Sequence, residues 1–365
     1  MNVPFIDLKR TFLLYQKEYE EVLLKTARSG WYILGKQLEL FEKQFSDYLN
    51  TKHCIGVGCG QDSLILAVRA LGISKGDEVI VAGNTYIATV LGVTENDATP
   101  VFVDCDDYYQ LDVDLIQQAL TDKTKAILTT NLYGQCSNTS IMREICDHHG
   151  LFLIEDCAQS HGAMLDGISA GQLADIACYS FYPTKPLGAM GDGGACTTNN
   201  DELAEKLRML RNYGSRKKYI NEIEGLNTRL DELQAAVLQV GLKHLNECNE
   251  ERRRIAKRYL AEVSNPHVLL PKLRENDYPV FHIFAIRSKN RDKLQKYLAE
   301  KGVQTQIHYP IPPYQQKCYE GNSFTKKDLP KTDLFAKQEL SLPIYAGMPE
   351  SEINYVIDAV NAFEG

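Results

Sequence analysis

The amino-acid sequence predicts an α/β protein with a large, mostly parallel sheet flanked by helices and a smaller C-terminal α/β domain. Two observations lead to this prediction. Short β-branched runs alternate with helical patterns from about residue 50, and a long helical segment then separates them from a second, shorter α/β stretch. The chain has 365 residues, 44% of them hydrophobic, which is enough to build two domains.

The large domain is expected to contain seven strands. Between them lie stretches such as DSLILAVRALG, in which apolar residues recur at helical spacing. Strands that alternate with helices in this way favour a sheet with helices on both faces. The expected strands are the runs HCIGVG, DEVIVAG, PVFVD, AILTTN, LFLIED, IACYSF and GACTTN.

A second domain is expected to begin near residue 245. Residues 226–263 carry apolar side chains at helical spacing with charged faces, and Pro266 and Pro271 then end the helix. The strand-like VFHIFAI, the helical RDKLQKYLAEKG and the loop HYPIPPY follow. We therefore predict a large domain with an N-terminal arm at 1–244 and a small α/β domain at 245–365.

Charge and composition argue against several classes of protein. The chain has 48 acidic and 40 basic residues and no basic run interleaved with aromatics, so neither DNA nor RNA is an expected partner. The opening MNVPFIDLKRTFLLYQ lacks a signal-peptide pattern, and no segment approaches the roughly 18 apolar residues of a membrane span. We therefore expect a cytoplasmic protein. Its ten cysteines form no C-x-x-C pair, so we expect reduced thiols and no metal site.

The ends of three expected strands carry residues suited to one ligand. The first strand leads through Gly58 and Gly60 into a helix that begins near Gln61, and free amides at a helix start bind phosphate. The fifth strand ends at Asp156, and the sixth ends near Ser180. Lys185 follows, 29 residues after Asp156. Because ligands of open α/β sheets bind at the carboxyl ends of the strands, these groups are expected to meet.

This set of groups matches the needs of pyridoxal 5′-phosphate (PLP). PLP requires a lysine amine, a carboxylate that keeps its pyridine nitrogen protonated, and amides and hydroxyls around its phosphate. Lys185 and Asp156 fill the first two roles, and the start of the helix together with Ser180 fills the third. Each residue alone has an ordinary explanation, such as a helix-capping aspartate or a surface lysine. The combination predicts a PLP enzyme.

The same segments resemble a known family. EDCAQSHGA, SFYPTKPLGAMGDGGA, RNYGS and GLNTRLDELQAAVL, in that order, resemble the DegT-type sugar-nucleotide aminotransferases of PLP fold type I, the aspartate-aminotransferase-like fold. The resemblance continues through VPFIDLKR, GWYILGKQLELFEKQF, AGNTYIAT, QIHYPIPPY and LPIY, so it covers nearly the whole chain. It implies Lys185 as the catalytic Schiff-base lysine, with cofactor contacts from Tyr86 on the ring face, Asp156, Gln159 at the ring hydroxyl, and Ser180 at the phosphate. The amides of Gly60 and Gln61 at the start of the helix are expected to add to the phosphate contacts.

The resemblance also implies a homodimer. Asn227, in GLNTR, matches the residue that reaches the cofactor phosphate from a second subunit, so the active sites would lie at the dimer interface. Substrate contacts are expected from a further set, although each residue is about equally open to a purely structural role. These residues are His161 in AQSHGA, Lys218 and Tyr219 in the loop RKKY, and His308 with Tyr309 in QIHYP.

The implied reaction transfers an amino group from an amino acid, expected to be L-glutamate, to a nucleotide-linked keto sugar. Lysine at 185 favours amino transfer, because related enzymes that remove a hydroxyl carry histidine there. The stretch SFYPTKPLGAMGDGG is more like the enzymes acting at C-3 than those acting at C-4. We therefore expect a dTDP-3-keto-6-deoxyhexose as acceptor. Pro186 and Gln61 depart from the commoner asparagine and threonine, which weakens any finer prediction of the substrate.

Three alternatives remain at this point. A C-4 sugar aminotransferase fits nearly the same motifs. A nicotinamide-dependent oxidoreductase would explain GVGCG after a strand, but the third glycine is missing, and Asp77 and Glu78 precede the second strand where an acid should follow it. A non-catalytic regulator that binds PLP or a sugar nucleotide is also open, because a fold does not determine a function.

Overall fold

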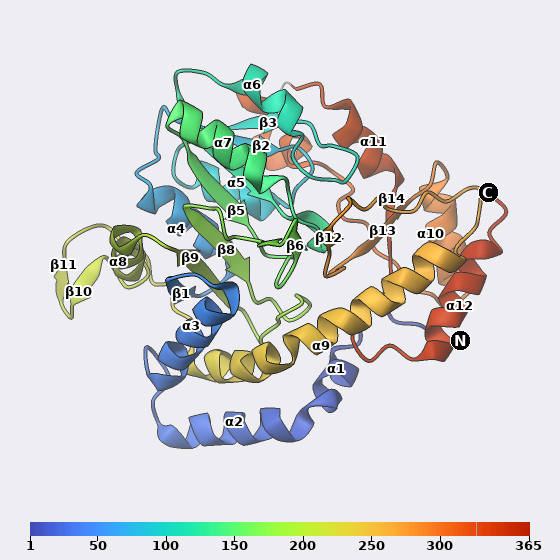
Figure 1. The fold of residues 1–365 in the computed structure, drawn as a ribbon, viewed down its shortest axis with the longest axis horizontal. Helices are drawn as coiled ribbons and strands as arrows, with labels where there is room; N and C mark the ends of the chain where they lie inside the picture. Colours follow the sequence, from blue (N-terminus) through green and yellow to red (C-terminus); the bar gives the residue numbers. More distant parts are fainter. Residues whose placement is uncertain (326) are drawn as a thin grey trace.

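The structure is a computed structural model that describes residues 1–325 and 327–365. Figure 1 shows a large lobe built around one sheet and a smaller lobe that contains both termini. The long helix α9 (Glu232–Glu262) runs from the first lobe into the second. Helices α1 (Leu8–Leu14) and α2 (Gln16–Ser29) form an N-terminal arm beside the first half of α9.

The seven expected strands form one sheet in the order β1-β9-β8-β5-β4-β2-β3. Neighbours from β8 to β3 are parallel, whereas β9 runs antiparallel to both β8 and β1. The prediction of a mostly parallel sheet is therefore confirmed. The strands are β1 (His53–Val57), β2 (Glu78–Ala82), β3 (Thr99–Val103), β4 (Thr124–Thr130), β5 (Phe152–Asp156), β8 (Ile176–Ser180) and β9 (Gly194–Thr198).

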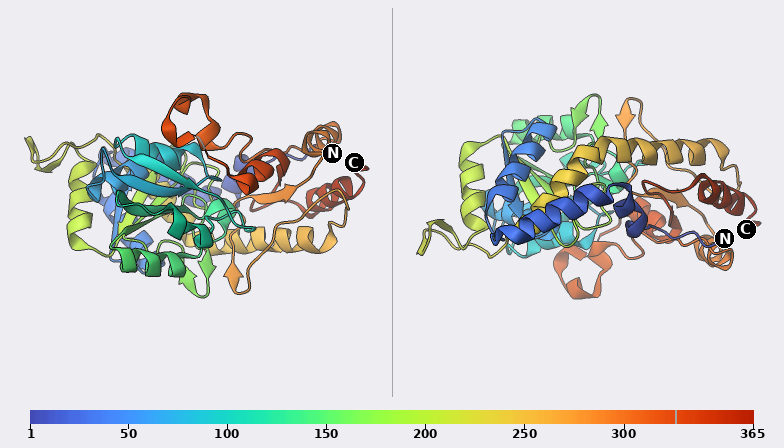
Figure 2. Two further views of the ribbon diagram at one scale, coloured as in Figure 1. Left: turned by 90° about the horizontal axis from the view of Figure 1, so that it is seen from above. Right: turned by 90° about the horizontal axis from the view of Figure 1, so that it is seen from below.

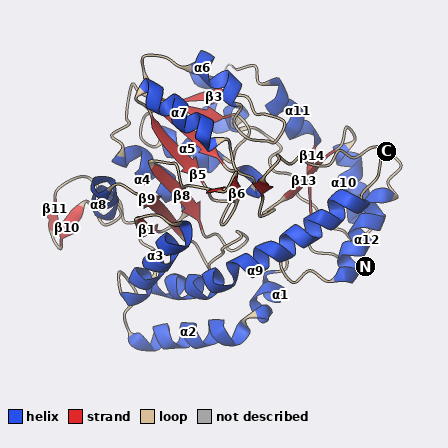
Figure 3. Ribbon diagram, in the orientation of Figure 1, coloured by secondary structure: helices blue, strands red, loops and turns tan. Residues whose placement is uncertain are grey.

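Helices cover both faces of this sheet, as Figure 3 shows. Alternate strand residues point to opposite faces, so Ile55 and Val79 pack toward α4, α5 and α8, whereas Tyr179 packs toward α3 and α9. Helices α6 and α7 cover the rest of that second face. The helices are α3 (Lys36–Leu49), α4 (Gly60–Ala70), α5 (Ile87–Thr94), α6 (Ile116–Ala119), α7 (Thr139–His149) and α8 (Asp201–Leu210).

The smaller lobe has its own apolar core. Side chains from the second half of α9, such as Tyr259, pack with Phe284, Leu342 and Val356, and Val3 of the N-terminal arm joins them. Because α9 is continuous through residue 245, the predicted domain boundary lies within a helix and stays a prediction. The elements of this part are β13 (Phe284–Arg287), α10 (Arg291–Glu300), α11 (Pro330–Gln338), β14 (Glu339–Leu342) and α12 (Glu350–Asn361).

Short elements complete the fold. The hairpin of β10 (Ser215–Lys217) and β11 (Ile220–Asn221) projects from the end of the large lobe in each view of Figure 2. No helix of the described chain is long and apolar enough to cross a membrane. The remaining elements are β6 (Met164–Leu165), β7 (Ile168–Ser169), β12 (Asp277–Tyr278), η1 (Val113–Leu115), η2 (Leu132–Gly134), η3 (Pro313–Gln315), η4 (Lys317–Tyr319) and η5 (Ser323–Thr325).

Candidate active site

Three neighbouring strands end together and define the candidate site. Thr130 of β4 lies opposite Asp156 of β5, and β8, on the other side of β5, ends at Ser180. The turn after β1 reaches the same edge, because Val57 and Ser180 both pair with Gly194 of β9. The sheet therefore brings the predicted phosphate turn, the aspartate and the lysine loop to one place, as the strand order of an open α/β sheet requires.

Asp156 is a buried carboxylate held by hydrogen bonds. Its Oδ2 accepts from the hydroxyl of Thr89 at 2.7 Å, and its Oδ1 accepts from the amide of Ala158 at 3.1 Å. Burial raises its pKa, while these two donors and the charge of Lys185 lower it. Thr89 is joined in turn to Thr85 at 2.7 Å, so one face of the carboxylate is held in a fixed direction. A positive charge placed beside this buried carboxylate would keep it ionised.

Lys185 lies in a tight loop that follows β8. Its amide donates to the carbonyl of Tyr182 at 2.8 Å. A Cβ on Gly188 would lie 2.4 Å from the carbonyl oxygen of Pro183, so the loop can close this tightly only with glycine at that position. Burial lowers the pKa of the Lys185 amine to about 8, and the charge of Asp156 limits that fall. An amine with this pKa is partly neutral near pH 7, as a nucleophile or proton carrier must be.

The start of α4 forms a cradle beside Ser180. A Cβ on Gly60 would lie 2.5 Å from the Cβ of Ser180, so only glycine permits this approach of the turn to β8. Amides in the first turn of a helix have no acceptor within it, and the helix dipole makes this end positive. The amides of Gly60 and Gln61, with the hydroxyl of Ser180, therefore fit a phosphate group.

Two tyrosines and a glutamine form another wall of the site. Tyr86, at the start of α5, is half exposed, and its ring centroid lies 5.1 Å from that of Tyr309. Gln159 donates to the Tyr309 hydroxyl at 3.2 Å and accepts from the Tyr133 amide at 2.6 Å. An exposed aromatic face and an oriented amide suit a planar ring with a hydroxyl. The donor set as a whole fits PLP.

The two predicted substrate histidines lie in different environments. His308 is half-buried, and burial together with the nearby charge of Lys185 lowers its pKa to about 4. His161 is fully buried, and its ring lies 5.6 Å from that of Tyr179 and 5.8 Å from that of Phe181. A contact between His161 and substrate stays a prediction, and its burial argues against direct contact.

The remaining predicted residues make no contact with Asp156 or Lys185 in the described single chain. Lys218 and Tyr219 connect the strands of the β10–β11 hairpin, and Tyr219 is 87% exposed. Asn227 is exposed and forms an isolated bridge with Asn212, while its neighbour Thr228 accepts from the amide of Gly58 at 2.8 Å. None of the three is hydrogen-bonded to Asp156 or Lys185 among the described residues. Their roles at the site stay predictions.

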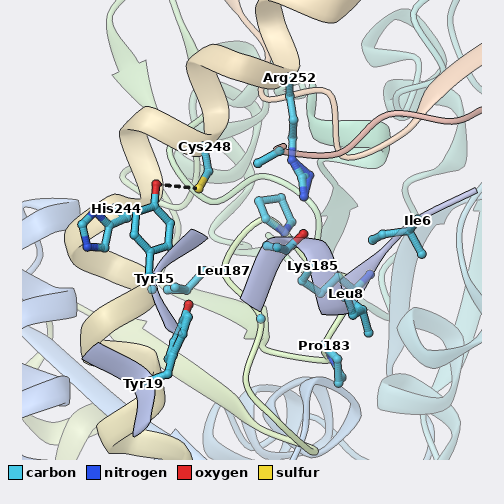
Figure 4. A pocket seen from close by; sticks show the side chains of 15 residues that line it. Ile6, Leu8, Tyr15, Tyr19, Pro183, Lys185, Leu187, His244, Cys248 and Arg252 are labelled. Atoms are coloured by element: carbon cyan, nitrogen blue, oxygen red, sulfur yellow. Dashed lines mark hydrogen bonds between the residues drawn. The ribbon is translucent and has the colours of Figure 1, made fainter. Parts of the chain in front are cut away.

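A small cavity of about 60 Å³ lies on the other side of the Lys185 loop. Figure 4 shows the side chain of Arg252 reaching from α9 toward this loop, with the stacked rings of Tyr15 and His244 beside it. Arg252 is buried, and its Nε and Nη1 have no hydrogen-bond partner among residues 1–325 and 327–365. Pro186, the departure noted in the sequence, lines the same cavity. The described residues contain no group of three side chains arranged to hold a metal ion.

Sequence reasoning gave no role to Thr89, Tyr133 or Glu339. Thr89 lies in AGNTYIAT, but its bond to Asp156 spans 67 residues and has no local signal. Tyr133 has a left-handed backbone (φ 62°) that directs its amide to Gln159, a conformation that tyrosine rarely adopts. Glu339 is buried at the start of β14, but it follows Lys337 and Gln338, so the sequence gives no sign that its carboxyl is buried.

Comparisons with known proteins found one matching family and several similar proteins. A model of the DegT/DnrJ/EryC1/StrS aminotransferase family matches residues 14–361. The chain is 46% identical to the dTDP-3-amino-3,6-dideoxy-α-D-galactopyranose transaminase of Aneurinibacillus thermoaerophilus, covering 99% of both chains. It is 44% identical to the dTDP-3-amino-3,4,6-trideoxy-α-D-glucose transaminase of Streptomyces venezuelae, over 98% of this chain and 95% of that protein.

The chain is also similar to a solved structure along nearly its whole length. The structure of S. venezuelae DesV in complex with a ketimine intermediate superposes with a TM-score of 0.96 at 44% identity, covering 99% of this chain and 98% of that one. The expected PLP fold type I, the aminotransferase class and the PLP cofactor are confirmed. The nicotinamide and non-catalytic alternatives are set aside.

Proposed function

We propose that this chain, which belongs to the DegT/DnrJ/EryC1/StrS aminotransferase family, transfers an amino group from L-glutamate to C-3 of a dTDP-3-keto-6-deoxyhexose. The product would be a dTDP-3-amino-3,6-dideoxyhexose. The observation that supports amino transfer most strongly is that Lys185 and Asp156 lie at one edge of the sheet, close enough for each charge to affect the pKa of the other. The choice of sugar is supported by the printed activities of relatives that are 46% and 44% identical to the chain.

Lys185, Asp156 and the residues around them have separate roles in this reaction. Bound PLP supplies an electron sink for the carbon that loses its proton. Lys185 Nζ, with a pKa of about 8, can take up and release that proton near neutral pH. The Asp156 carboxylate, held by Thr89, keeps a protonated nitrogen opposite it in the charged form. Tyr86 would stack on the face of the bound ring, and Gln159 would contact its hydroxyl.

The position of amino transfer can be determined directly. The holoenzyme is incubated with ¹⁵N-labelled glutamate and either a dTDP-3-keto or a dTDP-4-keto 6-deoxyhexose, and the product is examined by NMR. Nitrogen bonded to C-3 supports the proposal. Nitrogen bonded only to C-4 would replace it with the C-4 alternative, and amino transfer to neither sugar would remove the sugar assignment.

The active unit is proposed to be a homodimer with shared sites. Trp31 is 63% exposed and Tyr182 is 52% exposed, and large aromatics of this kind are enriched at protein–protein interfaces. A mainly apolar cavity of about 300 Å³, which includes Phe12 and Met190, opens between the N-terminal arm and the chain after Lys185. A partner that covers this surface could also bring the hairpin or Asn227 to the site.

Mixing two inactive variants tests this arrangement. Lys185→Ala removes the amine, and Asn227→Ala removes the residue expected to act across the interface. If sites are shared, the mixed dimer contains one site with both native residues and regains up to about a quarter of the wild-type activity. A stable monomer by light scattering, or no recovery on mixing, would contradict the proposal.

A cytoplasmic location is also proposed. All ten cysteines are free thiols, and seven of them are buried. Free buried thiols are typical of a reducing compartment. Fractionation of the producing cells checks this location.

A further inference from the structure

A closed chain of contacts supports His308 from behind. Its Nδ1 lies 2.8 Å from the Oγ of Ser341. The Ser341 hydroxyl bonds in turn to Oε1 of Glu339, and the other carboxyl oxygen of Glu339 accepts from the His308 amide at 2.6 Å. Glu339 and Ser341 are two residues apart on β14, so they lie on one face, and both are fully buried.

With a neutral imidazole, the hydrogen bonds that join His308, Ser341 and Glu339 can be arranged in two ways. A serine hydroxyl carries one proton and can donate it in one direction at a time. When Glu339 is ionised, Ser341 donates to it and therefore accepts from Nδ1–H of His308, which leaves a lone pair on Nε2. When Glu339 is protonated, it donates to Ser341, Ser341 donates to Nδ1, and Nε2 carries the proton.

His308 lies near the loop that carries Lys185. Its Nε2 has no hydrogen-bond partner among the described residues, and its ring lines a cavity of about 70 Å³ together with Thr184 and His282. Burial, and after it the charge of Lys185, lowers the pKa of His308 to about 4. The imidazole is therefore neutral near pH 7, and the property that can change is which nitrogen carries the proton.

The surroundings of Glu339 favour neither protonation state strongly near neutral pH. Burial raises the pKa of Glu339 to about 8, against hydrogen bonds from Ser341 and His308 and the charge of Arg291 on α10. Arg287 lies opposite Glu339 on β13. The other titratable groups that face this carboxyl are Tyr109, Tyr133 and Tyr309, whose raised pKa values keep them neutral.

We propose that Glu339 is a positioning residue that acts through Ser341 to set which nitrogen of His308 carries the proton in the active site. This inference rests on the proposed function for its meaning in catalysis. With Glu339 protonated, Nε2–H is a hydrogen-bond donor suited to a keto oxygen of the acceptor sugar. With Glu339 ionised, Nε2 is only an acceptor, and the step that uses the keto sugar should slow as the pH rises through this titration.

The test reads the tautomer itself by ¹⁵N NMR of histidine-labelled holoenzyme between pH 6 and 10. His308→Asn identifies the signal. In the wild type, the Nε2 resonance should move from the protonated to the unprotonated range as the pH rises. Glu339→Gln should hold it in the protonated range throughout, because the glutamine amide can donate to Ser341 at every pH. Ser341→Ala should uncouple the signal from pH.

A matched control is Ser288→Ala, which removes another buried hydroxyl at the end of the neighbouring strand and should titrate like the wild type. A His308 tautomer that is constant with pH in the wild type, or that titrates equally in Ser341→Ala, would overturn the inference. Because this signal does not depend on turnover, failure of the sugar assay and failure of the inference remain distinguishable. If Glu339→Gln does not fold, Ser341→Ala decides the question alone.

Discussion

The Lys185 pocket and the β10–β11 hairpin are built in opposite ways. In the pocket, Asp156 is 5% exposed and bonded to Thr89 and Ala158 of the same chain. In the hairpin, Tyr219 is 87% exposed and the strands have three and two residues. The Asp156 carboxylate is therefore held by contacts within its own chain, whereas so short a hairpin has little to hold it in place alone.

This difference suggests that the pocket carries out the reaction and that the hairpin contributes to binding the nucleotide sugar. A buried carboxylate and a nearby amine influence one another strongly, because little solvent screens them. Exposed lysines interact weakly until a ligand or partner removes water from them. Substitutions in the pocket should therefore change the rate of amino transfer, and substitutions in the hairpin should change the affinity for the nucleotide sugar. The following predictions test that division, starting with the largest expected effect.

Lys185→Ala should lower amino transfer by about 10³-fold, within the range of a lost general acid–base group. The rate of 2-oxoglutarate formation from glutamate in the presence of the keto sugar measures this. Lys43→Ala, which removes an exposed lysine paired only with Asp47, is the matched control and should keep full activity. A Lys185→Ala enzyme within tenfold of the wild type would contradict the assignment of the catalytic amine.

Asp156→Asn should lower the rate by about 100-fold, equivalent to about 2.7 kcal/mol of barrier. The neutral amide keeps the size of the side chain but cannot hold a positive charge opposite it. Single-turnover absorbance with glutamate measures the effect. The control is Glu155→Gln, a neighbouring buried carboxyl that bonds to Asn131 and Gly171 on the other face of the strand. It should change the melting temperature more than the rate per folded molecule, and equal rate losses in both variants would remove the special role of Asp156.

Lys218→Ala should raise KM for the nucleotide sugar by about tenfold, equivalent to about 1.4 kcal/mol of binding. The half-reaction with glutamate should be unchanged, because the hairpin lies away from Lys185 in the same chain. Comparing the two half-reactions by stopped-flow absorbance checks this. A slowed glutamate half-reaction would contradict the assignment of the hairpin to nucleotide-sugar binding alone.

Thr89→Val should weaken catalysis by about fivefold, equivalent to about 1 kcal/mol, because it removes one hydrogen bond to the Asp156 carboxylate. Steady-state kinetics measure the loss. Thr94→Val on the same helix removes a hydroxyl that contacts Tyr319 and should leave the rate unchanged. Equal effects of the two substitutions would indicate damage to α5 rather than to the site.

The smallest effect concerns pH. Covalent capture of PLP by the apoprotein requires the neutral Lys185 amine, so its rate should rise with pH through about 8 instead of above 10. The Asp156 charge favours the protonated amine, so Asp156→Asn should move this midpoint to lower pH. Capture rates followed by absorbance at several pH values measure both midpoints. A midpoint near 10 would contradict a buried Lys185.

The sequence predicted the parts of this molecule that depend on local patterns. β-branched runs located all seven strands of the large sheet, and strand ends located Asp156 and Lys185. It did not predict that β9 runs antiparallel, because the period of a strand carries no information about direction. Thr89 and Glu339 also escaped, since their contacts join residues 67 and 31 positions apart. The resemblance supplied Tyr86 and Gln159, which spacing alone did not predict.

The most direct test of the central claim is the absorption spectrum of the purified protein with PLP, before and after glutamate, for the wild type and Lys185→Ala. The account predicts a band of bound cofactor in the wild type that glutamate removes and that the keto sugar restores. In Lys185→Ala, glutamate should leave the cofactor spectrum unchanged on the same time scale. A wild type without a bound-cofactor band, or a Lys185→Ala variant that responds as fast as the wild type, would contradict the account.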